Sequence, residues 1–352
     1  MTKVLVVGGG VAGCATALAL HQAGIPAVVY EAHPSGGDDA GAFLTVMANG
    51  MAALEVIGAD RCVVDASYPA GAVELFDAEG RHLRHRAIEG PARTLRRATL
   101  YRVLQDFAAA RGVRVVHGKR MVDARRADGG GGVEVRFADG GRAEGDLLVG
   151  ADGIHSRTRH LIDPQAPTPR YTGQHVVYGY ADGNPAGSAS DAYHMVFGSR
   201  AFFGFTAPGD GRTWWFARVT GERRPGGTTA EQSRDLALAA VRDDTTPAAA
   251  IIQATGAAVV GGDSYDIPTT PHWHDDRMVL VGDAAHAASP AAAQGASMAL
   301  EDAVALAAAL REHPDPAVAF TAYTALRRQQ TEETVAASAQ LARGHGSTPD
   351  ST

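Results

Sequence analysis

The sequence has few cysteines, few lysines and no cluster of basic residues. Its 352 residues include only two cysteines, Cys14 and Cys62, which excludes a disulfide framework and a zinc site built from four cysteines. Lysine occurs only at Lys3 and Lys119, so a mechanism that needs a lysine elsewhere in the chain is excluded. The net charge of -7 without a basic block argues against nucleic-acid binding, and no metal site is predicted.

Long apolar runs are also missing. The first run, residues 4–7, stops at Gly8, and no later run approaches the roughly 20 residues that a membrane span needs. The N-terminus shows no signal-peptide cleavage pattern, so we expect a cytoplasmic protein without a membrane span. Hydrophobic residues make up 45% and charged residues 20% of the chain, which is ordinary for a globular enzyme.

The order of apolar patterns indicates an α/β protein. A buried strand at 3–8, a helix at 11–23 and a second strand at 27–30 form one βαβ unit, the start of a Rossmann-like domain. Further strands are predicted at 43–47, 72–76, 81–88, 113–116, 120–126, 133–138, 142–149 and 278–282. Helices are predicted at 49–57, 97–110, 230–243, 294–311 and 315–342. The aromatic-rich middle of the chain, residues 166–269, favours a mostly antiparallel sheet.

These patterns predict a cofactor domain that is discontinuous in sequence. We assign residues 1–70, 97–165 and 270–343 to it, with helices at its C-terminal end. Residues 71–96 and 166–269 are predicted to form a mostly antiparallel β substrate-binding domain, and the polar stretch 344–352 a disordered tail.

A glycine motif lies between the first strand and the first helix. Gly8, Gly10 and Gly13 have the Gly-x-Gly-x-x-Gly spacing that brings a pyrophosphate against the helix N-terminus, beside Val11 and Ala12. Glu31 ends the second strand, where its carboxylate can accept hydrogen bonds from an adenosine ribose. An acid there argues against NADP as the tightly held nucleotide. The motif alone does not separate NAD from FAD.

Two later motifs make that distinction. Residues 146–153 read Asp-Leu-Leu-Val-Gly-Ala-Asp-Gly and lead into Ser156 and Arg159. Residues 279–286 read Val-Leu-Val-Gly-Asp-Ala-Ala-His and lead into Pro290 and residues 294–296. Together the three motifs resemble the class A flavoprotein monooxygenases, the family of para-hydroxybenzoate hydroxylase, over about residues 3–165 and 270–335. The resemblance implies non-covalent FAD, NAD(P)H as a transient reductant and O2 as substrate, through a flavin C4a-hydroperoxide.

The resemblance also implies roles for particular residues. Asp283, after Gly282, would bind a ribityl hydroxyl of FAD, and Arg97 would contact the pyrophosphate or the ring edge. Asp152 and Gly153 would lie at the pyrophosphate and influence NAD(P)H binding. The remaining predicted cofactor contacts are Ala32 and, beside the isoalloxazine ring, Pro290, Gln294, Gly295 and Ala296.

The chain departs from the family pattern at three places. The loop usually runs Pro-x-x-Gly-Gln-Gly, whereas Ala293 precedes Gln294 here, and its methyl group is expected to restrict the backbone beside the flavin. Ala32 and His33 stand where an arginine usually follows the acid of the second strand. Asp38 and Asp39 occupy a stretch that often carries an arginine in the family.

The substrate prediction rests on aromatic residues. We expect a phenolic or polyketide-like small molecule, bound by a protein that is a monomer or a weak homodimer. His194 and Tyr178 are the candidate general bases. The predicted pocket residues are Phe43, Thr45, Met47, Phe203, Phe205, Trp215 and Pro290.

Several rival functions share this fold. A flavin halogenase would use a lysine near the substrate and a Trp-x-Trp-x-Ile-Pro segment, whereas Trp214 and Trp215 are adjacent here. Baeyer–Villiger oxygenation, epoxidation and reduction of isoprenoid double bonds stay open. A non-catalytic FAD-binding partner of another oxygenase is the alternative from a different class.

Overall fold

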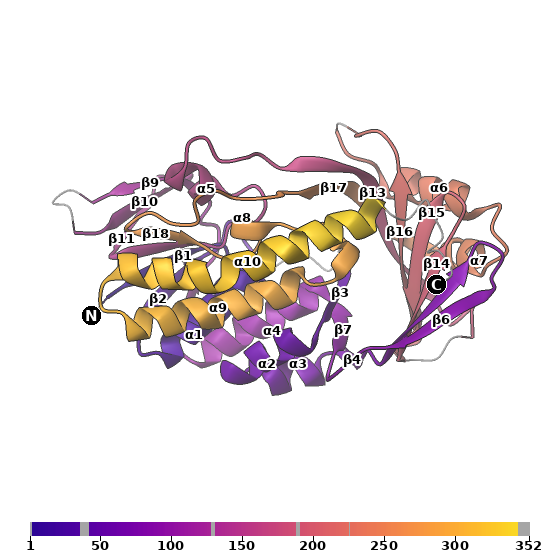
Figure 1. The fold of residues 1–352 in the computed structure, drawn as a ribbon, viewed down its shortest axis with the longest axis horizontal. Helices are drawn as coiled ribbons and strands as arrows, with labels where there is room; N and C mark the ends of the chain where they lie inside the picture. The colour runs from indigo at the N-terminus through magenta and orange to yellow at the C-terminus, as the bar shows by residue number, and fades with distance from the viewer. Residues whose placement is uncertain (1, 36–41, 128–130, 188–190, 225, 344–352) are drawn as a thin grey trace.

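The structure is a computed structural model that describes residues 2–35, 42–127, 131–187, 191–224 and 226–343 (Figure 1). Asp38, Asp39 and the predicted tail 344–352 lie outside these residues. A parallel sheet with its helices forms the left-hand part of the molecule in Figure 1, and a larger, mostly antiparallel sheet forms the right-hand part. The predicted α/β fold class is confirmed.

The parallel sheet has five strands in the order β18-β12-β1-β2-β8. Their bounds are Met278–Leu280, Leu147–Gly150, Val4–Val7, Ala27–Tyr30 and Arg114–Val116. All four residues of β1 and of β12 are buried, as expected for strands covered on both faces. Parallel strands end at the same edge of a sheet, so the loops after β1, β2, β12 and β18 meet there.

Helices rich in alanine cover one face of this sheet. Helix α1 (Val11–Gln22) packs on α9 (Gly295–Glu312), and the long α10 (Pro316–Arg343) lies outside α9 (Figure 1). The same core includes side chains of α4 (Arg97–Ala110) and α2 (Ala48–Val56). Five short helices that we did not predict join these elements. They are α3 (Asp60–Asp65), α5 (Arg157–Ile162), α7 (Ala248–Gln253), α8 (Asp283–His286) and the 3-10 turn η1 (Pro290–Ala292).

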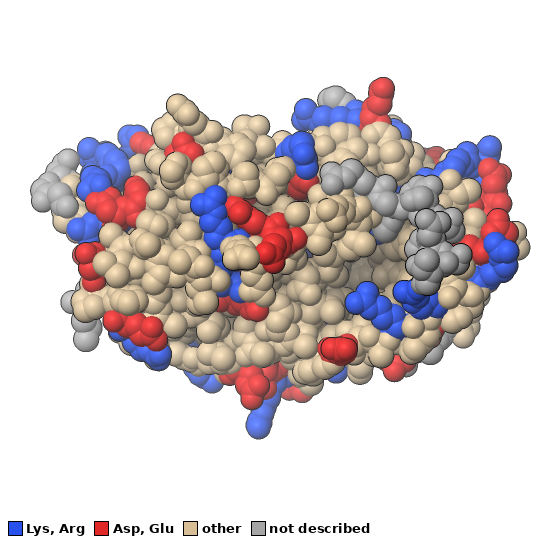
Figure 2. All heavy atoms as spheres, in the orientation of Figure 1, with Lys and Arg blue, Asp and Glu red and all other residues tan. Residues whose placement is uncertain are grey.

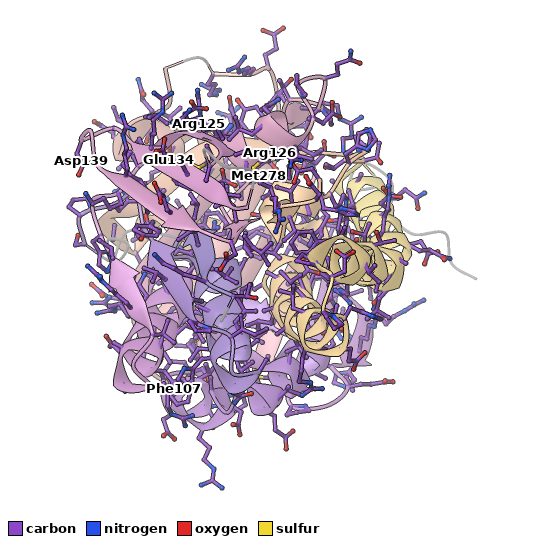
Figure 3. The ribbon with its side chains drawn as sticks, turned by 90° about the vertical axis from the view of Figure 1, so that its left-hand side faces the viewer. Phe107, Arg125, Arg126, Glu134, Asp139 and Met278 are labelled. Atoms are coloured by element: carbon purple, nitrogen blue, oxygen red, sulfur yellow. The ribbon has the colours of Figure 1, made fainter. Side chains whose placement is uncertain are left out.

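The single strand predicted at 142–149 is two strands in different sheets. β11 (Arg142–Gly145) pairs with β10 (Val133–Phe137), which pairs with β9 (Met121–Arg126), whereas β12 joins the parallel sheet. The chain turns at Asp146, whose carboxylate accepts a hydrogen bond from the Lys3 amide at 2.6 Å. On the three-stranded sheet Arg125 donates to Glu134 on the neighbouring strand at 3.1 Å (Figure 3).

The second sheet has seven strands in the order β17-β13-β16-β15-β14-β5-β6. Their bounds are Thr255–Asp266, Arg170–Asp182, Arg212–Thr220, Ala201–Thr206, Ala192–Phe197, Ala72–Asp77 and His82–Ala87. Neighbours are antiparallel except β14 and β5, which are parallel. Helices α6 (Ala230–Val241) and α7 pack on one face of this sheet.

A small sheet lies against the other face. It has the order β3-β7-β4, with bounds Phe43–Val46, Arg93–Arg96 and Tyr68–Pro69. Thr45 and Thr94 share hydrogen bonds with the Tyr193 hydroxyl, at 2.9 and 2.6 Å, and so attach this sheet to β14. Strand β7 pairs with β3. Our predicted division separates these two strands, because it assigns residues 71–96 to the substrate-binding domain and residues 1–70 to the cofactor domain. The division into two domains stays a prediction.

Candidate functional site

The glycine loop is shaped by contacts that leave no room for side chains. A Cβ atom on Gly13 would lie 1.8 Å from the Gly8 carbonyl oxygen, and one on Gly8 would lie 2.2 Å from the Ala151 oxygen. A Cβ on Gly10 would have its nearest neighbour, the Tyr101 ring, at 3.8 Å. The loop is therefore closed on the protein side and open at Gly10, as a pyrophosphate cradle requires.

Glu31 lies at the end of β2 and faces this loop. Its carboxylate accepts hydrogen bonds from the Gly9 amide at 2.6 Å and from the His33 amide at 2.8 Å. Both oxygens retain acceptor capacity for ribose hydroxyls. Ala32 is half-buried beside it.

Arg97 is the first residue of α4, and we call the region around Arg97, Tyr101 and Asp283 the Arg97 recess. The Arg97 side chain is exposed to water but donates a hydrogen bond to the Tyr101 hydroxyl. Burial among surrounding atoms acts to lower the pKa of Arg97, but Tyr101 and Asp283 outweigh it, so the pKa is raised. A cation that stays charged, is reachable by solvent and lies near Asp283 suits an anionic cofactor group.

The loop after β12 is held from within the chain. The Asp152 carboxylate accepts hydrogen bonds from the Ser156 hydroxyl at 2.6 Å and from the Thr158 amide at 3.0 Å, and so caps α5. Arg159 is buried and donates to the carbonyls of Ile154 and Ala284, which ties this loop to α8. Gly153 faces open space. The contacts of Asp152 and Gly153 with cofactor stay a prediction.

Gly282 and Asp283 are positioned by a buried ionic network that we did not predict. Asp302 on α9 is fully buried, accepts a hydrogen bond from the Gly282 amide at 2.9 Å and contacts His286 Nε2 at 2.5 Å. The Arg327 side chain on α10 donates to the other oxygen of Asp302 at 2.9 Å. The sequence feature that could have revealed this network is Asp302 itself, the acid on an otherwise apolar face of α9.

The charges of this network are mutually stabilising. Burial opposes ionisation of Asp302, but His286 and Arg327 outweigh it, so the pKa of Asp302 is lowered. Burial likewise opposes the charged form of His286, but Asp302 outweighs it, so the pKa of His286 is raised. His286 is 2% exposed, so it acts within the fold rather than in an open pocket.

The loop from Pro290 to Ala296 is fixed by α10. Ser338 accepts a hydrogen bond from the Ala292 amide at 3.1 Å and donates one to the Ser289 carbonyl at 2.7 Å. Ala293 has φ +53°, and among the described residues it alone combines a positive φ with a side chain. The expected backbone restriction therefore falls on a left-handed residue, a conformation that costs a non-glycine residue about 1–2 kcal/mol.

The end of this loop meets Asp283. A Cβ on Gly295 would lie 4.0 Å from Asp283 Oδ1. The side chain of Gln294 contacts Asn49 of α2, while Pro290 is exposed and Ala296 half-buried. Because Gly295 opens α9, the free amides at this helix start point toward the same recess as Asp283.

The two faces of the seven-stranded sheet divide the predicted pocket residues. Phe43 and Met47 pack with the face opposite α6 and α7, whereas Thr45 is occupied by its bond to Tyr193. The side chains on this face are Tyr178, Tyr180, Tyr193, Met195, Trp214 and Phe216. Burial raises the pKa of Tyr178, while Arg97 and Arg218 act to lower it. Tyr178 thus lies near the Arg97 recess.

Four predicted residues lie on the other face, which corrects their assignment. Phe203, Phe205 and Trp215 are 0%, 3% and 0% exposed and pack with α6 and α7, so they cannot line an open pocket. His194 stacks between Phe76 and Phe205 on that side, so it is not placed with Tyr178 as a candidate base. Successive residues of a strand point to opposite faces of the sheet. For these four residues the predicted sheet was correct, but the residues chosen on it point to the covered face.

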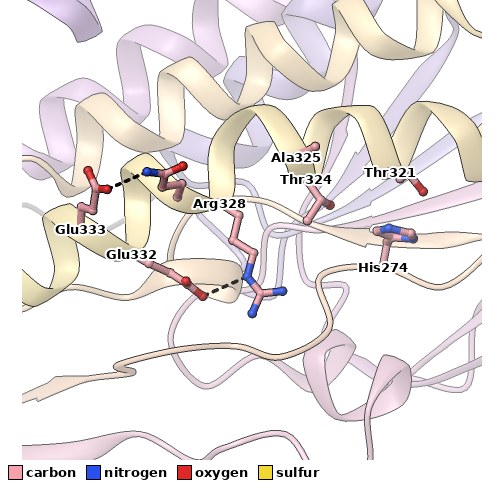
Figure 4. A pocket seen from close by; sticks show the side chains of 8 residues that line it. His274, Thr321, Thr324, Ala325, Arg328, Glu332 and Glu333 are labelled. Atoms are coloured by element: carbon pink, nitrogen blue, oxygen red, sulfur yellow. Dashed lines mark hydrogen bonds and ion pairs between the residues drawn. The ribbon is translucent and has the colours of Figure 1, made fainter.

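A groove of about 510 Å³ on the outer side of α10 is a separate feature (Figure 4). Arg328 donates a hydrogen bond to Glu332 and Gln329 donates one to Glu333, both at 3.0 Å, so these polar side chains already have partners. Within the described residues no three His, Cys, Asp or Glu side chains are placed to hold a metal ion. No helix of the described chain has the length and apolarity to cross a bilayer.

The fold and these loops define a class of FAD-binding oxidoreductase. The chain belongs to the FAD binding domain family, which matches residues 1–338, and it is a class A FAD-dependent monooxygenase. It is 31% identical to aurachin C monooxygenase/isomerase of Stigmatella aurantiaca, over 96% of this chain and 88% of that protein. It is 30% identical to 3-amino-4-hydroxybenzoate 2-monooxygenase of Streptomyces cremeus, over 94% of this chain and 84% of that protein.

A solved structure agrees in fold. The structure of HpxO from Klebsiella pneumoniae, complexed with FAD and uric acid, superposes with a TM-score of 0.90 at 26% identity, over 99% of this chain and 89% of that one. FAD is therefore the cofactor, and NAD(P)H is the reductant typical of the family. The open side of Gly10 and the solvent-reachable Arg97 fit a dinucleotide. The contacts of individual residues with FAD stay predictions.

Proposed function

We propose that this chain hydroxylates an aromatic small molecule, phenolic or polyketide-like, with NAD(P)H and O2. The observation that supports this most is the aromatic face of the seven-stranded sheet beside the Arg97 recess. Tyr178 and Phe216 on this face are half-buried, with rings 6.3 Å apart, so their faces can take up a flat apolar ring. Relatives named for hydroxybenzoate and uric acid agree with a flat substrate.

In the proposed cofactor site, each loop has one task. The Gly8–Gly13 loop and the start of α1 hold the pyrophosphate, Glu31 holds the ribose, and Asp283 holds a ribityl hydroxyl. The amides at the start of α9, near Gly295, stabilise negative charge on the ring system. When bound, FAD supplies the redox chemistry that NAD(P)H and O2 require.

In the proposed substrate site, the chain orients a ring and excludes water. Arg97 and Arg218 both act to lower the pKa of Tyr178 against the effect of burial, and its hydroxyl is the group proposed to hydrogen-bond a phenol oxygen of the substrate. Burial lowers the pKa of Arg218 to about 10, partly offset by Tyr178, and its guanidinium lies 4.2 Å from the centre of the Phe202 ring. Arg218 is 5% exposed and remains charged near neutral pH, so it favours an electron-rich, partly ionised ring through its electric field rather than by contact.

The test is a screen for NAD(P)H oxidation by the FAD-loaded protein, with O2 uptake and peroxide release recorded together. An aromatic substrate should accelerate NAD(P)H oxidation and lower the share of O2 that returns as peroxide. Phe216→Leu should raise KM for that compound, whereas Phe203→Leu, on the opposite face, should leave KM unchanged. The proposal fails if no aromatic compound accelerates the reaction. If NAD(P)H does not bleach the bound flavin, the chain is a non-catalytic FAD-binding protein.

A further inference from the structure

One line of residues crosses the seven-stranded sheet from the Arg97 recess to its edge. The strand registers place these residues opposite one another on successive strands, and we call them the open row: Tyr178, Phe216, Gly204, Met195, Leu75 and Arg84. Because side chains of paired residues share a face, the row lies on the face opposite α6 and α7. Six strands are five spacings apart, so the row spans about 24 Å.

The row is partly accessible, although the Phe43 ring lies 6.1 Å from the rings of both Tyr178 and Phe216. Tyr178, Phe216, Met195 and Leu75 are all half-buried, and Arg84 is exposed. In the next row Tyr193 and Trp214 are 5% and 2% exposed, because the small sheet around Phe43 covers them. A continuous, partly exposed apolar strip of this kind is consistent with a binding surface.

Gly204 makes the strip continuous. A Cβ atom there would lie 2.4 Å from the Phe216 ring and 2.8 Å from the Met195 sulfur. The missing side chain thus allows Phe216 and Met195 to close over β15. A larger residue would interrupt the strip halfway along its length.

The outer end of the strip is basic. Arg84 and Arg86, the basic edge, are exposed on β6 and alternate with His85 along the strand, so both point to the side of the open row. Neither has an ion-pair partner among the described residues, whereas Arg81 pairs with Asp77 at 2.6 Å. Figure 2 shows the molecule hollowed between its two parts, with Lys and Arg side chains at the rim toward β6.

We propose that the open row binds an elongated amphipathic ligand whose anionic group pairs with Arg84 and Arg86. The apolar body lies over Leu75, Met195 and Phe216, and a carboxylate or phosphate reaches the basic edge. This deepens the proposed function, since it rests on the proposed placement of the reacting ring at Tyr178. It narrows the substrate to compounds with an acidic group about 24 Å from that ring, about five strand spacings.

The test uses isothermal titration calorimetry of the FAD-loaded protein, without NAD(P)H, with dodecanoate, dodecyl phosphate and methyl dodecanoate as probes. Both anions should bind about tenfold tighter than the neutral ester, the effect of one charge-assisted hydrogen bond. That preference should shrink as salt is added, because the basic edge is exposed. A preference for one anion shows whether a carboxylate or a phosphate is the better fit.

Variants assign the effect to the basic edge. The double variant Arg84→Glu with Arg86→Glu should abolish the preference for anions and leave ester binding unchanged. The control, Arg61→Glu with Arg120→Glu, makes the same charge change at exposed sites away from the sheet and should retain the preference. Gly204→Leu should weaken all three probes.

Two outcomes would overturn the proposal. Equal binding of ester and anions by the unaltered protein would show that the basic edge only protects an edge strand from pairing. An anion preference that survives the double variant would place the anion elsewhere. Neither outcome depends on turnover, so a failed hydroxylation screen leaves this result readable.

Discussion

Replacing Asp302 with asparagine removes the only anion that the described residues place between His286 and Arg327. All three side chains are at least 94% buried, and the aspartate bridges both cations and the Gly282 amide. Removing one partner of a buried pair costs about 3–5 kcal/mol, because a charge is left uncompensated away from water. That is a large part of the roughly 5–15 kcal/mol that stabilises a typical domain.

Urea unfolding of the FAD-free protein measures this loss. Trp273 packs 5.4 Å from the His286 ring and reports on this region, while Trp214 and Trp215 report on the seven-stranded sheet, so fluorescence follows unfolding of both parts. The matched control is Glu301→Gln, which removes a neighbouring carboxylate that is 21% exposed and pairs with the same Arg327 at 3.0 Å. We expect the control to cost about 1 kcal/mol or less. If Asp302→Asn costs no more than the control, the network does not stabilise the Gly282 turn.

Three further predictions follow from the contacts above. Gly13→Ala should destabilise the loop itself, because a Cβ there would lie 1.8 Å from the Gly8 oxygen, whereas Gly10→Ala should leave the fold intact and weaken FAD retention, measured by absorbance, because its Cβ enters the open side proposed for the pyrophosphate. Trp215→Ala should cost about 3–5 kcal/mol in urea unfolding and leave the affinity for aromatic ligands unchanged. Because the pKa of His286 is raised in the folded state, protonated His286 contributes its full stabilisation below pH 6.5, its ordinary pKa. This stabilisation is lost as the pH rises through the pKa of His286 in the folded state. Because the pKa of Asp302 is lowered in the folded state, ionised Asp302 contributes its full stabilisation above pH 3.8, and this is lost as the pH falls through its folded-state pKa. The difference in unfolding free energy between the parent protein and Asp302→Asn should therefore be largest between pH 3.8 and 6.5.

Sequence patterns correctly predicted those helices and strands whose position depends only on local features, such as an apolar run, a glycine or helical spacing. The apolar run and glycines at 4–13 gave the first strand and helix, and the helix at 97–110 was predicted to the residue. The split of 142–149 was missed because its second half is apolar throughout, and only the pairing of Asp146 with Lys3 shows where one sheet ends and the other begins.

The candidate site was predictable where a motif carries the chemistry. The loops at Gly10, Glu31 and Asp283 were predicted from their motifs, and their contacts with FAD stay predictions. Asp302, which contacts Gly282, and Ser338, which contacts Ala292, lie on helices far along the chain and were not predicted. The face that each aromatic residue occupies depends on strand parity, and a run such as Thr-Trp-Trp-Phe is apolar on both faces. Which face is open depends on what packs there, and that is a tertiary property.

The attachment of the Pro290 loop to Ser338 has a consequence for synthesis. The loop is made some 45 residues before the serine that fixes it, as the interval from 292 to 338 shows. Nearly all of α10 must therefore be synthesised before the Pro290 loop can adopt the conformation that Ser338 fixes. The complete loop is therefore available to FAD only after Ser338 has been made, long after synthesis of the glycine loop at residues 8–13.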